Sequence, residues 1–255
     1  MHKFDRFKKL ISEDSFENIS SKTVLVVGVG GVGGYVVEAL VRSGIGKIII
    51  VDGDMVDETN INRQIIALSS TVGQSKVDVF EKRIKDINEK CEVIKINKFI
   101  DAANIDILFD YEFDYLVDAC DTVSTKLALI DRCILEKRKF ISSMGTGNKL
   151  DPSMLEIVDV RKTVNDPLAR IVRKHVKDKR INDKVLVLSS RELPIKTGDR
   201  TPGSTSFVPS SAGLLIASYI IRTFINEDKY HLCTGWLHTR QRRTPTDSYR
   251  TEHDF

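Results

Sequence analysis

The chain has 255 residues and a mass of 28.8 kDa, with 41% hydrophobic and 29% charged residues. This length fits one domain or two small ones, and the apolar share excludes an intrinsically disordered chain. The formal net charge of +3 permits an anionic partner without requiring one.

The first elements predicted along the chain form a strand–helix–strand unit. Thr23–Val27 (TVLVV) is a continuous β-branched run, typical of a strand buried on both faces of a parallel sheet. Residues 28–34 are rich in glycine and predict a turn, followed by a helix that runs through Val41. Lys47–Val51 (KIIIV) predicts the next strand. A unit of about 30 residues built in this way is typical of a right-handed parallel crossover.

Strands and helices continue to alternate up to about residue 150. The sequence predicts a helix at 75–89, strands at 92–96 and 115–119, a helix at 125–136 and a short strand at 140–142. Beyond residue 150 the pattern predicts strands at 155–160 and 185–188, a helix starting at Asp166-Pro167 and a loop at 197–209. We therefore predict an α/β fold: a doubly wound, Rossmann-like, mainly parallel sheet with a less regular, mixed α/β C-terminal half.

The cysteines and the apolar segments indicate the cellular compartment of the protein. Cys91, Cys120, Cys133 and Cys233 form no C-x-x-C pair, which excludes the usual structural zinc spacing and favours reduced thiols. The charged N-terminus, MHKFDRFKKL, lacks the apolar core of a signal peptide. The longest apolar stretch, residues 212–221, is shorter than the ~20 residues that span a bilayer. We expect a cytoplasmic protein without a transmembrane segment, in which 212–221 form a buried helix.

The first candidate site is the glycine turn. Residues 28–33 read GVGGVG and satisfy G-x-G-x-x-G between a predicted strand and a predicted helix. Glycines let the backbone approach phosphates closely, and the helix N-terminus supplies amide donors. Asp52 ends the second predicted strand, where its carboxylate can accept hydrogen bonds from a ribose. The turn predicts a nucleotide site but does not distinguish a dinucleotide from ATP.

A second set of polar residues distinguishes an ATP site from a dinucleotide site. A triphosphate needs fixed cations where pyrophosphate leaves, whereas a nicotinamide site does not. Arg63 offers a planar fork for phosphate oxygens, and Lys76 opens a predicted helix as a point charge. Asp121 follows a predicted strand, where it can hold Mg²⁺. Singly, each is also explained as a surface charge or a helix cap, but their order after the glycine turn favours ATP.

These motifs carry a family resemblance. GVGGVGG, VDGDMVDETNINRQ, VGQSK and DACDT, in this order, resemble the ATP-binding core of the ubiquitin-activating-type (ThiF/MoeB-like) adenylyltransferases. Within that superfamily, NINRQIIAL, KLDPSMLEIVDV and KTVNDPLARIVRK are similar to the tRNA threonylcarbamoyladenosine dehydratases. The resemblance runs from about residue 6 to about residue 223. It implies one ATP-binding domain at 1–225, with a nucleotide core at about 20–150 and a substrate-facing half at about 151–225. The polar residues 226–255 predict a loose tail.

The resemblance also implies roles for individual residues. Arg63, Lys76 and Asp121 would be the catalytic residues, with Asp121 as the Mg²⁺ ligand. Gly31 would lie against the phosphates of ATP, Asp52 would hold the ribose, and Asn60 would contact the triphosphate. The complete nucleotide set is Gly28, Gly30, Gly31, Gly33, Asp52, Asp54, Asn60, Arg63, Gln64, Lys76, Asp121 and Thr122. Whether a monovalent cation also binds is left open.

Partners follow from the same resemblance. In the relatives, an arginine near the N-terminus reaches into the site of a partner subunit, which implies a homodimer. Arg6 opens the matching segment, while Lys9 stands where the relatives often carry that arginine, so both residues are candidates. The resemblance also implies a sulfur-transfer partner of the cysteine desulfurase system.

The implied reaction is an ATP-dependent dehydration. The threonyl carboxylate of N6-threonylcarbamoyladenosine in tRNA would be adenylated, and the activated carbonyl would then be captured within the same side chain to close a ring. One feature supports tRNA independently of the resemblance. Residues 161–200 carry 12 Lys/Arg against 5 Asp/Glu, which predicts a basic surface suited to a nucleic-acid backbone.

Three other functions remain to be weighed. An adenylyltransferase that activates the C-terminal glycine of a ubiquitin-like sulfur-carrier protein usually carries two C-x-x-C pairs, which this chain lacks. An NAD-binding oxidoreductase explains the glycine turn and Asp52 but leaves Arg63, Lys76 and Asp121 without roles. A module that binds nucleotide without turnover is disfavoured by the complete motif set.

Overall fold

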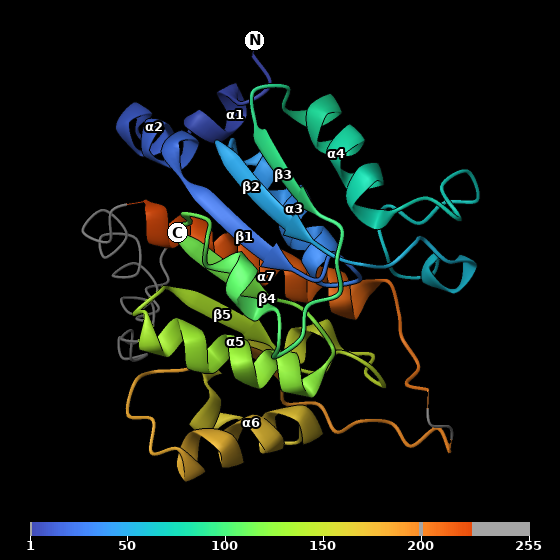
Figure 1. The fold of residues 1–255 in the computed structure, drawn as a ribbon. Helices are drawn as coiled ribbons and strands as arrows, with labels where there is room; N and C mark the ends of the chain where they lie inside the picture. Colours follow the sequence, from blue (N-terminus) through green and yellow to red (C-terminus); the bar gives the residue numbers. More distant parts are fainter. Residues whose placement is uncertain (1, 199–200, 226–255) are drawn as a thin grey trace, which may run out of the picture.

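The computed structural model describes residues 2–198 and 201–225 of the chain. In this part of the chain, seven strands form one sheet in the order β3-β2-β1-β4-β5-β7-β6 (Figure 1). The strands are β1 (Thr23–Val27), β2 (Lys47–Val51), β3 (Glu92–Ile96), β4 (Tyr115–Asp118), β5 (Phe140–Ser143), β6 (Leu155–Asp159) and β7 (Leu186–Ser190). All neighbouring strands are parallel except β6 and β7, which are antiparallel. The predicted α/β fold class is therefore confirmed.

Helices cover both faces of the sheet (Figure 1). They are α1 (Asp5–Lys8), α2 (Glu13–Ser21), α3 (Gly33–Arg42), α4 (Lys76–Ile87), α5 (Val123–Leu135), α6 (Pro167–Asp178) and α7 (Phe207–Phe224). Short 3₁₀ segments lie at Glu58–Asn60, Ile105–Leu108, Pro152–Met154 and Val160–Lys162. Residues of α3, α4 and α7 share one hydrophobic cluster with the sheet, and residues of α5 and α6 share a second cluster on the opposite face.

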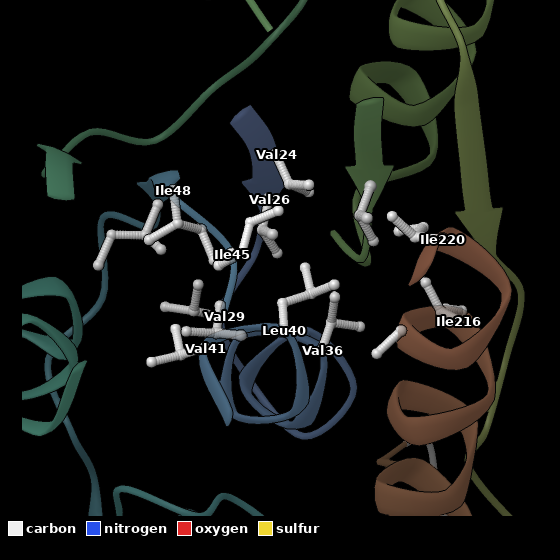
Figure 2. Packing of buried hydrophobic residues seen from close by; sticks show 14 of the residues in the cluster. Val24, Val26, Val29, Val36, Leu40, Val41, Ile45, Ile48, Ile216 and Ile220 are labelled. Atoms are coloured by element: carbon white, nitrogen blue, oxygen red, sulfur yellow. The ribbon is translucent and has the colours of Figure 1, made fainter. Parts of the chain in front are cut away.

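The inner position of β1 in the sheet explains why Val24–Val27 are all apolar. Val24 and Val26 of β1 belong to the cluster with α3 and α7, while Leu25 and Val27 belong to the cluster with α5 and α6. Figure 2 shows Val24 and Val26 facing Leu40 of α3, with side chains of α7 beside them. Because successive side chains of a strand point to opposite faces, a strand covered on both sides needs an apolar residue at every position.

The strand order reverses next to β1. The chain passes from β1 through α3 to β2 on one side, while β4 pairs with β1 on the other side. The loop after β1 and the loop after β4 therefore emerge side by side at the carboxyl edge of the sheet. Such a reversal is the usual ligand crevice of open α/β sheets.

The C-terminal helix corrects one prediction. The loop expected at 197–209 ends earlier, because α7 begins at Phe207 and runs to Phe224 rather than over 212–221. Pro209 had favoured a loop, but it occupies the first turn of the helix. Backbone N–H groups there have no intrahelical acceptor, so the missing N–H of proline costs no hydrogen bond. Residues 199–200 of the expected loop lie outside the described residues.

Helix α7 is long and apolar enough, by length and composition alone, to cross a membrane. Half of it is buried inside the fold, where Ala212, Ile216 and Ile220 belong to the cluster around α3 (Figure 2). The expectation of a buried helix in this region is therefore confirmed.

Other boundaries differ from the predictions by a few residues. The strand expected at 185–188 covers Leu186–Ser190, and Val160 begins a 3₁₀ segment instead of ending β6. Helix α6 starts at Pro167 as predicted, with the Asp166 side chain accepting a hydrogen bond from the Ala169 N–H at 2.8 Å. Helices α1 and α2 were not predicted. The tail at 226–255, with Cys233, lies outside the described residues, and the domain limits stay predictions.

Candidate active site

A cavity of about 350 Å³ opens at the carboxyl edge of β1, β2 and β4, where the strand order reverses. Of the residues predicted to bind nucleotide, all except Gly33 line it: Gly28, Gly30, Gly31, Asp52, Asp54, Asn60, Arg63, Gln64, Lys76, Asp121 and Thr122. The fold thus brings together residues that are up to 94 positions apart, counted from Gly28 to Thr122. Their individual roles stay predictions.

The glycines of the turn divide into two groups. Gly28 has a φ of 83°, and a Cβ added to it would lie 2.8 Å from the carbonyl oxygen of Ala119. A Cβ on Gly33, the first residue of α3, would lie 1.8 Å from the carbonyl oxygen of Gly28. These two positions need glycine for the turn itself. Gly30 and Gly31 line the cavity, next to the N-terminus of α3, where backbone amides and the helix dipole favour an anion.

A buried ammonium lies between two carboxylates at the wall formed by β2 and α4. Lys76 is 4% exposed, and its Nζ donates to Oδ2 of Asp54 at 2.6 Å and lies 3.8 Å from Oδ1 of Asp52. Asp52 also accepts hydrogen bonds from the backbone N–H groups of Val29 and Asp54, each at 2.9 Å. Burial raises the pKa of Asp52, and the Lys76 ammonium partly counters this rise. The lysine is therefore held in place beside the cavity before any ligand arrives.

The loop from 57 to 64 contributes three predicted residues. Asn60 accepts a hydrogen bond from the Asp57 N–H at 3.2 Å, which completes a capping box on the 3₁₀ segment Glu58–Asn60. Nη1 of Arg63 donates to the carbonyl oxygen of Thr59 at 2.8 Å and to Oδ1 of Asn62 at 2.9 Å. The turn thus presents the Arg63 guanidinium at the cavity.

The side chain of Gln64 is buried at the cavity with an acceptor atom that no described residue satisfies. Its side chain lies beside Gly30 at the cavity, and the residue is 7% exposed. Within the described part of the chain, its buried Oε1 has no hydrogen-bond partner. Buried polar atoms without a partner are uncommon in native proteins. An acceptor left in this state fits a site that is completed by a bound molecule.

The loop after β4 carries the predicted magnesium ligand. The Ala119 N–H donates to the carbonyl oxygen of Val27 at 2.8 Å, which fixes the start of this loop against β1. Asp121 is exposed at the cavity, and Thr122 is the N-cap residue of α5. Residues 2–198 and 201–225 contain no cluster of three or more potential metal ligands among His, Cys, Asp and Glu. A single carboxylate nevertheless fits Mg²⁺, which usually takes its other ligands from water and phosphate.

Beneath this loop lies a charge pair that sequence reasoning missed. Asp118 and Lys126 are both 0% exposed, with the lysine Nζ 2.8 Å from Oδ2 of the aspartate. Ser142 donates to the same oxygen at 2.5 Å, and Oδ1 accepts from the N–H of Cys120 at 3.2 Å. Burial raises the pKa of the Cys120 thiol, so this cysteine stays protonated. The only sequence signal was a lysine directly before the apolar residues 127–130 of α5.

The cavity also has walls that no motif marked. Lys98, Phe99 and Ile100 follow β3, Thr146 follows β5, and Ser204 and Pro209 come from the C-terminal half. The first three lie at the cavity because Ile96, at the end of β3, pairs with Val51, at the end of β2. Nothing in the sequence marked Thr146 or Ser204, since only the tertiary fold brings them beside the glycine turn.

The two candidates for an intersubunit contact lie elsewhere. Arg6 is in α1 and Lys9 is its C-cap residue, and neither lines the cavity. Helix α1 follows Lys3, which pairs with Glu89 just beyond the end of α4, and Phe4 packs on Phe16 of α2 at 5.5 Å between ring centroids. Within one chain, neither residue reaches the site.

Within the described residues 161–198, most basic side chains of the predicted basic stretch are exposed on the C-terminal half. This stretch centres on α6, whose buried residues Ala169, Val172 and Val176 face the sheet. The exposed basic side chains in and around this helix are Arg161, Lys162, Arg170, Lys174, Lys177, Lys179 and Arg180.

Comparisons with known proteins agree with this geometry. The model of the ThiF family matches residues 5–253. A tRNA threonylcarbamoyladenosine dehydratase of Bacillus subtilis (strain 168) is 40% identical over 244 residues, which cover 89% of this chain and 96% of the relative. The crystal structure of tRNA N6-threonylcarbamoyladenosine dehydratase from Escherichia coli in complex with AMP superposes with a TM-score of 0.84 at 31% identity, over 89% of this chain and 96% of that one.

A second structure of the E. coli enzyme, in complex with ATP, gives a TM-score of 0.83 at the same identity and coverage. Relatives named as adenylyltransferases match less of the chain. A probable molybdopterin-synthase adenylyltransferase of Porphyra purpurea is 35% identical over 119 residues, which cover 46% of this chain and 31% of the relative. The chain therefore belongs to the ThiF family, on the branch of the tRNA threonylcarbamoyladenosine dehydratases.

Proposed function

We propose that the protein is an ATP-dependent enzyme that dehydrates N6-threonylcarbamoyladenosine in tRNA to its cyclic form. The observation that carries this proposal is similarity to a dehydratase over 96% of that relative's length. The meeting of Arg63, Lys76 and Asp121 at one cavity supports it. Activation of a carrier protein is the weaker alternative, because the adenylyltransferase relative matches about half of the chain.

The first chemical step makes a good leaving group. The threonyl carboxylate attacks the α-phosphorus of ATP, a phosphoanhydride bond breaks, and pyrophosphate leaves. Such a step depends on positioning and charge stabilisation and needs little proton transfer. Backbone amides of the glycine turn and of α3 would hold the phosphates, while Arg63 and Lys76 would neutralise the departing pyrophosphate.

The second step closes the ring. A nucleophile in the same threonylcarbamoyl side chain attacks the acyl carbonyl carbon and gives up its proton to solvent, and the acyl–phosphate bond breaks to release AMP. The carboxylate oxygen leaves with AMP, so the net change in the nucleoside is the loss of one water. Both steps fit the cavity residues, which supply cations, a carboxylate and backbone amides.

Magnesium is part of the proposal, with Asp121 as its protein ligand. When bound at Asp121, Mg²⁺ would supply positive charge that offsets the negative charge of the phosphates. We expect Asp121→Asn to raise the Mg²⁺ concentration needed for half-maximal activity by about 10-fold, because a neutral amide is a weaker ligand than a carboxylate. Titration of activity with MgCl₂ at saturating ATP measures this shift. Asp101→Asn, which changes an exposed carboxylate outside the cavity, is the control; identical titrations of Asp121→Asn and wild type would contradict the assignment.

We further propose a homodimer in which Arg6 or Lys9 completes the partner's site. Within one chain both residues lie away from the cavity, so a second copy must bring them there. The variants Arg63→Ala and Lys9→Ala (or Arg6→Ala) should each be inactive alone. When the two are mixed and allowed to exchange subunits, about a quarter of wild-type activity should return, because each mixed dimer has one intact site.

The outcome of mixing separates the two candidates. Only the variant of the residue that crosses the interface should complement Arg63→Ala. A protein that is active while monomeric in sedimentation experiments would contradict the dimer.

Arg161 and Lys179 pair with Asp159 and Asp131, and the other exposed basic side chains around α6 can pair with a phosphate backbone, which supports tRNA as the macromolecular substrate. Cytoplasmic localisation fits a tRNA-modifying enzyme and the free Cys91, Cys120 and Cys133. The family resemblance also implies a sulfur-transfer partner of the cysteine desulfurase system and a monovalent cation. Co-purification from cells and a comparison of activity in Na⁺ and K⁺ test these two.

Nucleoside mass spectrometry tests the proposed function directly. tRNA bearing N6-threonylcarbamoyladenosine, incubated with the protein and ATP, should yield a nucleoside lighter by one water. ATP–pyrophosphate exchange should require this tRNA and should not respond to a ubiquitin-like carrier protein. Exchange that depends on the carrier alone would favour the alternative function.

A further inference from the structure

Asn62, the chain neighbour of the cavity residue Arg63, forms hydrogen bonds in two directions. Its Oδ1 accepts a hydrogen bond from Nη1 of Arg63 at 2.9 Å, and its Nδ2 donates to the carbonyl oxygen of Ser204 at 3.1 Å. One side-chain amide thus joins Arg63, which is predicted to bind the triphosphate, to Ser204, which lies 142 positions from Asn62 in the chain. The residue is exposed, so these bonds are not needed to fill the core.

The acceptor on the far side is itself fixed. Ser204 lies in the segment 201–206, drawn as the orange trace that leads into α7 in Figure 1. Its neighbour Gly203 donates to Oδ1 of Asn148 at 2.6 Å, and Asn148 donates its N–H to the carbonyl oxygen of Gly203 at 2.8 Å. Asn148 has a φ of 57°, a left-handed conformation that asparagine tolerates better than most residues. The carbonyl oxygen of Ser204 is therefore a fixed point for Asn62.

The bonds of Arg63 leave its fork open to a ligand. Within the described residues, the guanidinium forms two hydrogen bonds, to Thr59 and Asn62. Both use Nη1. The Nε and Nη2 donors on its other edge are the pair that a phosphate binds in a bidentate way. A guanidinium held before ATP arrives loses less conformational freedom on binding than a free one.

We propose that Asn62 is a positioning residue, which holds the Arg63 guanidinium in its phosphate-binding orientation by anchoring it to the backbone of Ser204. The proposal rests on the proposed function only for its catalytic consequence, because its effect on ATP affinity requires only that Arg63 binds ATP. Asn62 thereby links the nucleotide core to the segment 201–206, which leads into α7.

A double-mutant cycle in ATP affinity tests this role. Asn62→Ala, Arg63→Ala and the double variant are titrated with ATP by calorimetry, with no tRNA present. We expect Asn62→Ala to weaken ATP binding by about 10-fold, because Arg63 loses a charge-assisted hydrogen bond. In the Arg63→Ala background the same change should have an effect of about 2-fold or less, since the residue acts through the missing arginine. A full 10-fold further loss, or wild-type affinity of Asn62→Ala, would overturn the proposal.

Two further variants separate positioning from simple stability. Asn182→Ala removes another exposed asparagine, between α6 and β7, and should bind ATP normally. Asn148→Gly keeps the left-handed backbone and its N–H bond to Gly203 but loses the side-chain bond. We expect it to weaken ATP binding by about 3-fold in wild type and not at all in Asn62→Ala. No effect in wild type would overturn the link through Ser204.

Thermal unfolding without ligand provides the last readout. The melting temperature of Asn62→Ala should match that of Asn182→Ala, and a marked drop would instead assign Asn62 a structural role. The catalytic consequence of Asn62→Ala is a lower kcat for the dehydration. No second substitution should restore this kcat in a variant that lacks Arg63. Failure of the proposed function is distinguishable, because the cycle in ATP affinity would stand even if the tRNA nucleoside were not the substrate.

Discussion

Arg63→Ala is expected to lower kcat for the ATP-dependent dehydration by about 10²–10³-fold, with the fold intact. The guanidinium lines the cavity and is oriented by Thr59 and Asn62, so it can meet charge that develops on pyrophosphate as the α-phosphorus is attacked. Stabilisation that is realised mainly in the transition state lowers kcat more than it raises KM for ATP. Single-turnover measurement of AMP formation at saturating ATP isolates this step.

A matched control excludes a general effect of losing an arginine. Arg42 is more than half exposed at the end of α3 away from the glycine turn, where it pairs with Glu38. Arg42→Ala should turn over at close to the wild-type rate. Arg63→Ala with a kcat within about 3-fold of wild type would contradict the assignment of Arg63 to the leaving pyrophosphate.

Lys76→Met is expected to lower kcat by about 10²-fold and also to change the pH dependence of ATP binding. In the proposed site Asp52 accepts a hydrogen bond from the ribose, and the ionised carboxylate is the stronger acceptor, while burial raises the pKa of this carboxyl. ATP affinity should therefore fall as the pH falls through that pKa. The Lys76 ammonium favours the ionised form, so its removal raises the pKa of Asp52 further. The acidic limb of the binding curve then moves to higher pH.

The same raised pKa has a defined effect on stability. A carboxyl that holds its proton more tightly in the folded state adds stability at low pH, and this contribution is lost as pH rises through its folded pKa. Removing the Lys76 ammonium should make this loss larger, because the ionised Asp52 is then left without its nearby cation. Calorimetric ATP titrations and thermal unfolding across pH measure both effects.

Lys82→Met serves as the control, because Lys82 is an exposed residue on the same helix. Its binding curve should coincide with that of wild type. An acidic limb in Lys76→Met that stays in place, or moves to lower pH, would contradict the coupling between Lys76 and Asp52.

The sequence determined the parts of the fold that rest on local patterns. The apolar run of β1, the glycine turn and α3 were predictable because burial on both faces and close backbone approach restrict the residue types allowed. The residues that meet at the cavity were predictable as a set, because their order along the chain follows the family motif. Helix α7 was predicted too short, because a proline in a first helical turn has the same local signature as a loop.

Only the tertiary structure decided which distant residues meet. The Asp118–Lys126 pair, the link from Asn62 to Ser204 and the placement of Thr146 depend on contacts between segments far apart in the chain, and such contacts leave no periodic trace in the sequence. The same holds for Arg6 and Lys9, whose distance from the cavity appears only once α1 is packed on α2. A residue's type is visible in the sequence, but its neighbours are set by the packing of the whole sheet and its helices.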